Sequence, residues 1–370
     1  MKIAHLALLL AVFSGSLAAQ DIQIVGTLSQ TIKTPASSLS VVKDSSRKEV
    51  ETVQEIKLLK VQLSPQAKQN LDNRAKDALA HTRQFARNAK PSIYPAKVEL
   101  GMNEVPVLNQ GLHGSCVTFA VTAAVDAVLN KGDYLSQLCQ LQLGNYLERN
   151  GFLPSGWNGS WGRIVLSQME SFGVVPKAQQ LAQGCGGMKH YPVDDINNDE
   201  GSMTVEEYHQ MSEDMSGKLY WSPILDFYQA LTTRVDTNRT IDAVKASLNA
   251  RDRLTFAVLL LDFDLGFVGA VGKNKVFGDT WVLTPEIARD IYLNPVFGAH
   301  EMVITGYDDN AVAVDEEGRK HKGLLTLRNS WGDKVGNQGD FYMSYDYFKL
   351  LVIEVARIHH LNHIDEEPQG

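Results

Sequence analysis

The sequence predicts an α+β fold in which helices precede strands. From Cys116 to Val128, small apolar residues recur at helical spacing, the pattern of a helix packed closely on its neighbours. Four runs with the composition of strands come later, separated by Gly, Asp and Asn turns: Leu254–Asp262, Glu301–Tyr307, Gly323–Arg328 and Gly339–Ser344. Because helices and strands are segregated along the chain, we expect a domain of two lobes.

A separate unit is predicted from residue 20 to residue 96, before this domain at residues 97–370. Its Ile22–Ile32 and Val53–Leu63 segments have the composition of strands and form a candidate hairpin. Ser64-Pro65 then combines a capping side chain with proline at a first helical position. Apolar residues continue at three-and-four spacing, which predicts a helix over residues 64–89.

The first 19 residues have the features of a signal peptide. Lys2 precedes an apolar run from Ile3 to Phe13, and Ser16 and Ala18 stand two apart as in a cleavage site. A run of about a dozen apolar residues is shorter than the roughly 20 that a spanning helix needs. We therefore expect a secreted protein without a membrane span, periplasmic or extracellular if its source is bacterial.

Composition and charge exclude several classes of function. The 370 residues are 44% hydrophobic and 21% charged, which is typical of a globular protein. A net charge of −8 without a Lys/Arg-rich run argues against nucleic acid as a partner. The three cysteines, Cys116, Cys139 and Cys185, lack the paired spacing of a zinc site, so we expect no metal or other cofactor.

Cys116 follows the segment Asn-Gln-Gly-Leu-His-Gly-Ser, which leads into the predicted helix. At a helix amino terminus, the dipole and the free backbone amides lower the pKa of a thiol and favour a nucleophile. A buried structural cysteine is the alternative interpretation. His113 lies nearby, and we interpret it as a loop residue rather than as a base or a metal ligand.

Two later segments carry polar residues that complement a reactive thiol. His300 begins a strand-like run, while Asn329 and Trp331 follow another such run. With Gln110 and Cys116, they supply a base for the thiol, an amide that holds the base, and donors for an oxyanion. Thiol acyl transfer requires these groups.

In this order, the motifs Gln-Gly-x-x-Gly-Ser-Cys, Ala-His with a strand ending in Gly-Tyr-Asp-Asp, and Asn-Ser-Trp-Gly resemble those of the papain-like cysteine peptidases. The likeness covers about residues 100 to 350. It implies a papain-like fold whose cleft lies between a helical and a β-rich lobe.

The resemblance also implies a role for each site residue. Cys116 would be the nucleophile and His300 the acid and base. Asn329 would orient His300 under the indole of Trp331, and Gln110 would form an oxyanion hole with the backbone amide of Cys116.

Substrate binding and a disulfide are implied in the same way. The stretch Asn158-Gly159-Ser160 resembles the family's Asn-Gly-Gly stretch, which pairs with a bound peptide. We assign Trp161 and Trp331 to substrate binding as well. A bridge between Cys139 and Cys185 resembles the family's bridge from the helical lobe to a later loop and would leave Cys116 free.

The sequence departs from the family pattern at several points. His113 replaces a disulfide cysteine three residues before the nucleophile, and Val117 replaces an aromatic residue directly after it. The separation of Cys116 from His300 is 184 residues (300 − 116), against the ~130–150 of the family signature. We expect the acidic segment 191–218, interpreted as an exposed insertion, to absorb part of this excess.

We therefore expect a monomeric cysteine peptidase that acts on peptides or proteins and is held latent by residues 20–96 as a propeptide. From Asp21 to Ala96 there are 12 Lys/Arg and 7 Asp/Glu, a net +5; the chain after Ala96 has 22 and 36, a net −14. Opposite charges favour docking of the two parts. The alternatives are a cell-wall amidase or endopeptidase, an acyltransferase with the same thiol chemistry, and a catalytically degenerate binding protein.

Overall fold

The computed structural model describes residues 21–34, 52–80, 93–194, 201–233, 235–261, 270–293 and 297–360. The predicted signal peptide and the predicted helical residues after Ala80 lie outside the described residues. Within these ranges, no helix combines the length and the apolar character that crossing a membrane requires.

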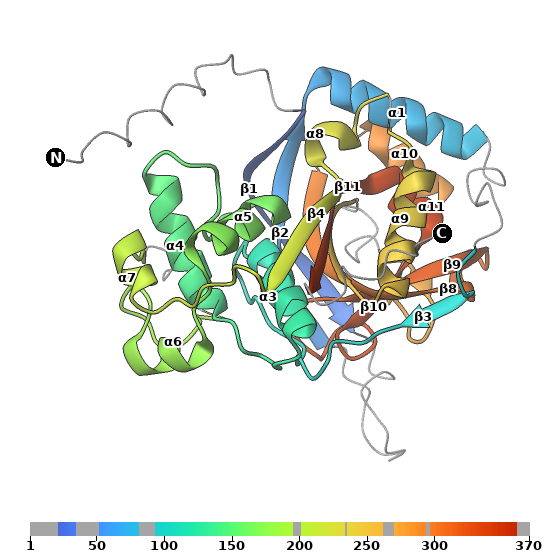
Figure 1. Ribbon diagram of the computed structural model, residues 1–370. Coiled ribbons are helices and arrows are strands. Elements are labelled where there is room, and N and C mark those ends of the chain that lie inside the picture. Colours follow the sequence, from blue (N-terminus) through green and yellow to red (C-terminus); the bar gives the residue numbers. More distant parts are fainter. Residues whose placement is uncertain are drawn as a thin grey trace, which may run out of the picture.

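Helices form one lobe of the molecule, on the left of Figure 1. At its centre is α3 (Cys116–Leu129), in which every residue from Cys116 to Ala127 is buried. Its alanines and valines allow close contact with other helices and with strands of the second lobe. The remaining helices of this lobe are α4 (Gln137–Arg149), α5 (Gly162–Phe172), α6 (Lys177–Gln183) and α7 (Val205–His209).

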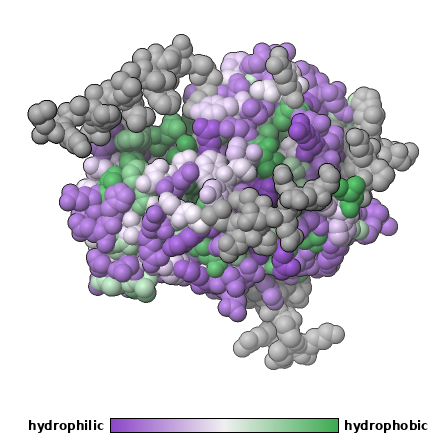
Figure 2. All heavy atoms as spheres, viewed as in Figure 1, coloured by the Kyte–Doolittle hydropathy of each residue, from purple (hydrophilic) through white to green (hydrophobic). Residues whose placement is uncertain are grey.

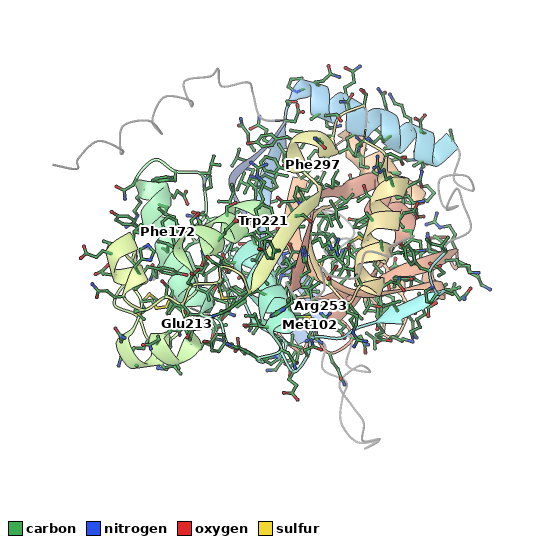
Figure 3. The ribbon with its side chains drawn as sticks, in the orientation of Figure 1. Met102, Phe172, Glu213, Trp221, Arg253 and Phe297 are labelled. Atoms are coloured by element: carbon green, nitrogen blue, oxygen red, sulfur yellow. A yellow bond between two sulfur atoms is a disulfide. The ribbon has the colours of Figure 1, made fainter. Side chains whose placement is uncertain are left out.

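The second lobe is built on a sheet with the order β4-β11-β5-β8, to which β8 adds β3, β6 and β9. The strands are β3 (Lys97–Glu99), β4 (Leu219–Leu225), β5 (Arg253–Leu260), β6 (Gly272–Lys273), β7 (Thr280–Trp281), β8 (Phe297–Asp315), β9 (Lys320–Arg328), β10 (Asp340–Ser344) and β11 (Val352–His360). The accompanying helices are α8 (Phe227–Ala230), α9 (Thr237–Asn249), α10 (Pro285–Leu293) and α11 (Tyr345–Leu351). Phe297, labelled in Figure 3, begins β8 and is fully buried. The four predicted strands correspond to β5, β8, β9 and β10.

The N-terminal hairpin runs between the two lobes in Figure 1. It consists of β1 (Ile22–Thr34) and β2 (Thr52–Leu63), which pair antiparallel along their whole length. The strands predicted in this region are therefore confirmed. β2 also pairs with the start of β8, with Leu59 opposite Ala299, so the hairpin extends the sheet of the second lobe.

Helix α1 (Pro65–Ala80) follows the hairpin and packs on α10 and α11. The Ser64 hydroxyl accepts a hydrogen bond from the Ala67 amide at 3.1 Å, the cap that the sequence predicts. The buried Asn70 side chain donates to the Leu231 carbonyl at 2.7 Å, and the Arg74 guanidinium donates to the Ala230 carbonyl at 2.7 Å. These bonds attach α1 to the second lobe.

The described part of segment 191–218, which we expect to be an exposed insertion, combines exposed and buried residues. Met203, Tyr208, Met211 and Met215 are buried, and α7 packs on α4 and α5. These apolar side chains are part of the helical lobe, while the acidic residues Glu206, Glu207, Glu213 and Asp214 are exposed. The acidic composition of the segment therefore does not reveal which of its residues are buried.

The surface of the molecule is mostly polar on the face drawn in Figure 2, where hydrophobic residues form separate small patches.

Cys139 in α4 and Cys185 after α6 form a disulfide, as the sequence predicts, and Cys116 is the free cysteine. Thiol titration of the denatured, unreduced protein should therefore find one thiol per chain. Finding three would contradict the bridge.

Replacing both bridging cysteines by alanine should lower the free energy of unfolding by about 2–4 kcal/mol, because the bridge restricts the unfolded chain.

Candidate active site

Cys116 is the first residue of α3 and is completely buried. Ser115 precedes it, and its hydroxyl donates to the Tyr191 hydroxyl at 2.8 Å rather than capping the helix. The Tyr191 hydroxyl in turn donates to the Gln110 carbonyl at 2.7 Å. The thiol therefore stands at a helix amino terminus that the neighbouring loop holds rigidly in place.

His300 and Asn329 come together from β8 and from the residue after β9. His300 Nε2 lies 2.8 Å from Asn329 Oδ1, and because an amide oxygen only accepts, Nε2 carries the proton. The imidazole stacks on the Trp331 indole, with ring centroids 4.4 Å apart and planes at 22°. His300 Nδ1 is buried and has no hydrogen-bond partner. This nitrogen is therefore available to accept a proton.

Burial holds both titratable groups in their neutral forms. It raises the pKa of the Cys116 thiol to about 12; the Glu301 carboxylate raises it further, while backbone amides of Glu301 and Val117 oppose the rise. Burial also lowers the pKa of His300 to about 4, against the effect of its bond to Asn329. The neutral thiol is the unreactive form of a cysteine nucleophile, and the neutral imidazole is the form that can accept a proton.

The hairpin contacts residues that surround these two groups. Gln54 Nε2 donates to the Trp331 carbonyl at 2.9 Å, and Gln110 Nε2 donates to the Lys57 carbonyl at 3.3 Å. Further along β2, Leu59 packs on Gly159 so closely that a β-carbon added to the glycine would lie 2.7 Å from Leu59 Cδ2. β2 thus crosses the site from Trp331, past Gln110, to Gly159.

Gln110, predicted to stabilise an oxyanion, is fully buried and held from two sides. Its Oε1 accepts from the Ser330 hydroxyl at 2.8 Å, and its Nε2 donates to the His113 carbonyl at 3.0 Å as well as to Lys57. A carbonyl oxygen of the hairpin therefore occupies a donor that could serve an oxyanion. Ser330 was not singled out in the sequence, although its place in the Asn-Ser-Trp-Gly motif is a signal that could have identified it.

The predicted substrate-binding stretch divides into two parts. Gly159 contacts the hairpin, and Asn158 is exposed beside it. Ser160 and Trp161 are buried, and the Trp161 indole stacks on Phe227 with centroids 4.5 Å apart. Trp161 therefore contributes to the packing of the lobes, whereas Gly159 lines the region that the hairpin fills.

His113 lies in a loop, as predicted, but is buried. Its Nε2 bonds to the Pro192 carbonyl at 2.7 Å, and its ring contacts Trp157 and Tyr191 with centroids 5.0 and 5.6 Å away. A hydrogen bond and aromatic packing therefore hold this part of the loop in place. The contacts connect the loop before Cys116 to the start of segment 191–218.

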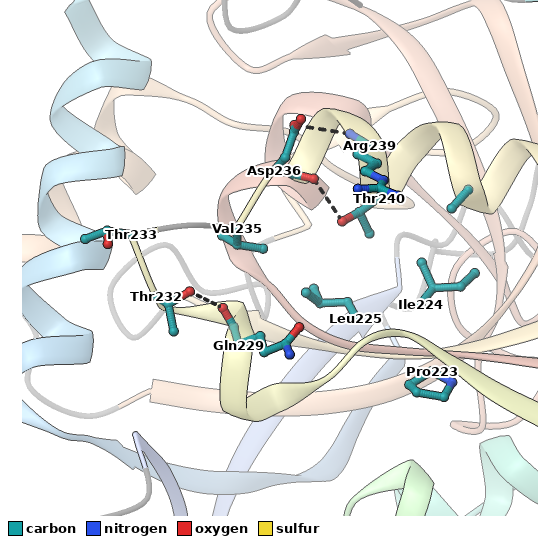
Figure 4. A pocket seen from close by; sticks show the side chains of 11 residues that line it. Pro223, Ile224, Leu225, Gln229, Thr232, Thr233, Val235, Asp236, Arg239 and Thr240 are labelled. Carbon is teal, nitrogen blue, oxygen red and sulfur yellow. Dashed lines mark hydrogen bonds between the residues drawn. The ribbon is translucent and has the colours of Figure 1, made fainter.

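Two of the cavities differ in their relation to this site. One of about 890 Å³ lies among β4, α8 and α9, lined by residues such as Leu225, Gln229 and Asp236, and includes none of the predicted site residues (Figure 4). The other, of about 420 Å³, lies between Gln54 of the hairpin and the loop at Trp331. The described residues contain no group of three or more His, Cys, Asp or Glu side chains suited to a metal.

The comparisons with known proteins concern cysteine peptidases. A model described as the Peptidase C1-like family matches residues 282–367, a stretch that includes His300, Asn329 and Trp331. No curated protein matches the chain. In its family motifs, the chain is similar to the papain-like cysteine peptidases, as the sequence predicts.

Solved structures with similar folds include three cysteine proteases. Xylellain from Xylella fastidiosa is 20% identical over 72% of this chain and 86% of its own, with a TM-score of 0.45. The proform of the ragweed pollen allergen Amb a 11 is 18% identical over 76% and 64%, with a TM-score of 0.45. Bromelain from Ananas comosus is 18% identical over 72% and 99%, with a TM-score of 0.42.

The burial of Cys116 predicts slow alkylation of the native protein. Its raised pKa leaves little thiolate below about pH 12, so iodoacetamide at pH 8 should react on the order of 100-fold more slowly than with the urea-unfolded chain. Mass spectrometry of the labelled protein measures both rates. Equal rates in the two states would contradict the buried, neutral thiol.

Proposed function

We propose that the protein is a cysteine peptidase that hydrolyses peptide bonds through an acyl-enzyme thioester and is made as a latent zymogen. The observation that carries this proposal is the geometry of His300. Its Nε2 is fixed on Asn329, its ring lies against Trp331, and its Nδ1 has no partner. This arrangement suits a base that acts on the thiol at the start of α3.

The residues can perform each step of the reaction. His300 Nδ1 takes the proton of Cys116 Sγ, and the thiolate attacks the carbonyl carbon of the substrate. Gln110 Nε2 and the Cys116 amide donate to the resulting oxyanion. His300 then protonates the leaving amine as the carbon–nitrogen bond breaks. Finally, His300 takes a proton from water, which attacks the thioester and releases the acid and the thiol.

Asn329 is a positioning residue in this scheme. Its Oδ1 accepts from His300 Nε2, which keeps Nδ1 unprotonated and directed away from the amide. The Ser330 backbone amide also donates to Oδ1, at 2.7 Å, and fixes the orientation of the Asn329 side chain. The imidazolium that forms during the reaction is stabilised by the same oxygen.

Latency follows from the position of the hairpin. While β2 fills the cleft, water and substrate are excluded from Cys116 and His300, and the Lys57 carbonyl occupies Gln110 Nε2. Once the hairpin leaves, hydration lowers the pKa of the thiol and raises that of the imidazole. Both shifts favour the thiolate–imidazolium pair. We therefore propose residues 20–96 as the inhibitory propeptide of a peptidase at residues 97–370.

Export is part of the proposal. The Cys139–Cys185 bridge suits an oxidising compartment, and the first 19 residues have the features of a signal peptide. Secretion as a latent protein would protect the proteins of the producing cell from the peptidase. The net charges of +5 and −14 on the two parts of the chain assist docking of the propeptide.

Replacing Asn329 by alanine should reduce kcat/KM for a peptide substrate by about 10- to 1000-fold, because His300 keeps its basicity but loses its orientation. Hydrolysis by the matured protein gives the measurement. Asn337→Ala is the matched control and should keep the wild-type rate, because the Asn337 side chain donates to the Tyr342 hydroxyl and not to the histidine.

Cys116→Ala should abolish hydrolysis with an unchanged melting temperature, and activity in that variant would refute the proposed nucleophile.

Weakening the hairpin should activate the full-length chain. Leu58 is buried against Gly298, so Leu58→Asp should release β2 from the cleft and raise hydrolysis of a small peptide by at least about tenfold. Val53→Asp, on the same strand but 58% exposed, should leave the protein latent. If Leu58→Asp remains as inactive as the wild type while Cys116 becomes alkylated, the hairpin is not the inhibitor.

A further inference from the structure

Two buried glutamates lie beside the candidate site without a part in the proposed reaction. Glu301 follows His300 on β8, and Glu354 lies on β11; they are 1% and 3% exposed. Both stand opposite Ala257 of the intervening strand β5, so the three residues form a row across the sheet. Because the middle side chain is only a methyl group, the two carboxyl groups can approach each other above it.

The start of α5 shows how closely these carboxyl groups approach. A β-carbon added to Gly162 would lie 2.5 Å from Glu301 Oε1 and 3.3 Å from Glu354 Oε2. Glu354 accepts from the backbone amides of Gly162 and Arg163, at 2.8 and 3.3 Å. The carboxyl oxygens of Glu301 make no hydrogen bond of good geometry, and the Thr255 hydroxyl on β5 is the neighbouring donor that lowers the pKa of this carboxyl. One member of the pair is thus satisfied by the helix, and the other has only this hydroxyl nearby.

The charged groups around the pair do not supply a further donor. The Arg163 guanidinium is 2.5 Å from Asp226 and lies over the Phe227 ring, so its charge is already matched. Burial raises the pKa of Glu301, and the neighbouring Glu354 raises it further, against the effect of the Thr255 hydroxyl. Burial likewise raises the pKa of Glu354 to about 7, against the effect of the two backbone amides. A carboxyl pair with raised pKa values is stabilised by any cation that reaches it.

The hairpin shows where a ligand would reach Glu301. Side chains alternate along β8, so Glu301 lies on the same face as Ala299, and Leu59 of β2 stands opposite Ala299. Leu59 Cδ2 also packs on Gly159, three residues before Gly162. The Leu59 side chain therefore lies between Gly159 and β8, on the face of β8 that carries Glu301.

We infer that the space occupied by Leu59 is a side-chain pocket that accepts Lys or Arg of a peptide substrate, with Glu301 and Glu354 binding the cationic end. The inference rests on the proposed peptidase function. The aliphatic stem of a basic residue would take the place of Leu59, and its amino or guanidinium group would donate to the carboxyl oxygens of Glu301. The hairpin's own leucine satisfies only the apolar part of the pocket. A basic substrate would use both parts.

The first test measures thermal unfolding of the full-length chain with Cys116→Ala, which cannot cleave itself. In this background, Leu59→Arg places a cation in the pocket. Leu58→Arg is the matched control, because Leu58 is equally buried on the same strand and faces Gly298 on the opposite side. Leu58→Arg should lower the melting temperature at least twice as much as Leu59→Arg. Adding Glu301→Gln should remove this difference.

An equal loss from both arginines, or a difference that persists with Glu301→Gln, would overturn the inference. Because unfolding needs no catalysis, this result is independent of the peptidase proposal.

The second test compares kcat/KM for matched peptides with Arg or Leu at the preferred position, using matured protein. Glu301→Gln should lower the Arg-to-Leu ratio at least about tenfold, whereas Asp126→Asn, a buried carboxyl in α3 that binds the Tyr134 and Leu135 amides, should not change it. The ratio cancels any common effect on the thiol. An unchanged ratio overturns the pocket assignment, while absence of all hydrolysis in the wild type overturns the proposed function instead.

Discussion

The packing of α3 against β8 is the contact on which the arrangement of the site depends. Cys116 begins the helix and His300 lies near the start of the strand, so the two groups meet only if these elements pack at short range. Alanine and valine on α3 permit that approach, since each large side chain on this face would widen the interface between the lobes. Asn329 and Trp331 then fix the histidine from the end of β9.

The hairpin uses the same interface. β2 pairs with Phe297, Gly298 and Ala299, directly before His300, so the strand that carries the histidine also carries the segment that covers it. Main-chain pairing needs no particular side chains, and the fit of the hairpin depends on glycines. At Gly114, Gly159 and Gly298, an added β-carbon would lie within 3 Å of Thr27, Leu59 and Leu58 respectively. These glycines thus leave room for side chains of the hairpin to approach the main chain closely.

Much of the site could be predicted from the sequence, because its chemistry lies in short motifs. Cys116, His300 and Asn329 stand in local patterns whose residue types suggest their roles, and the structure brings His300 and Asn329 together. The pairing of β2 with β8 could not be predicted, because it joins residues far apart in the chain and local composition does not specify a partner. The burial of Tyr208 could not be predicted either, because acidic residues precede it directly in the sequence.

Glu301 couples the thiol to the proposed pocket, because the same side chain affects both. Its negative charge raises the pKa of Cys116, so ionised Glu301 opposes formation of the thiolate. A cation bound to Glu301 would neutralise that effect at the moment when a substrate occupies the cleft. The neutral Leu59 of the hairpin provides no such compensation. Occupation by the hairpin and occupation by a basic substrate would therefore differ in the state of the thiol, although both fill the same space.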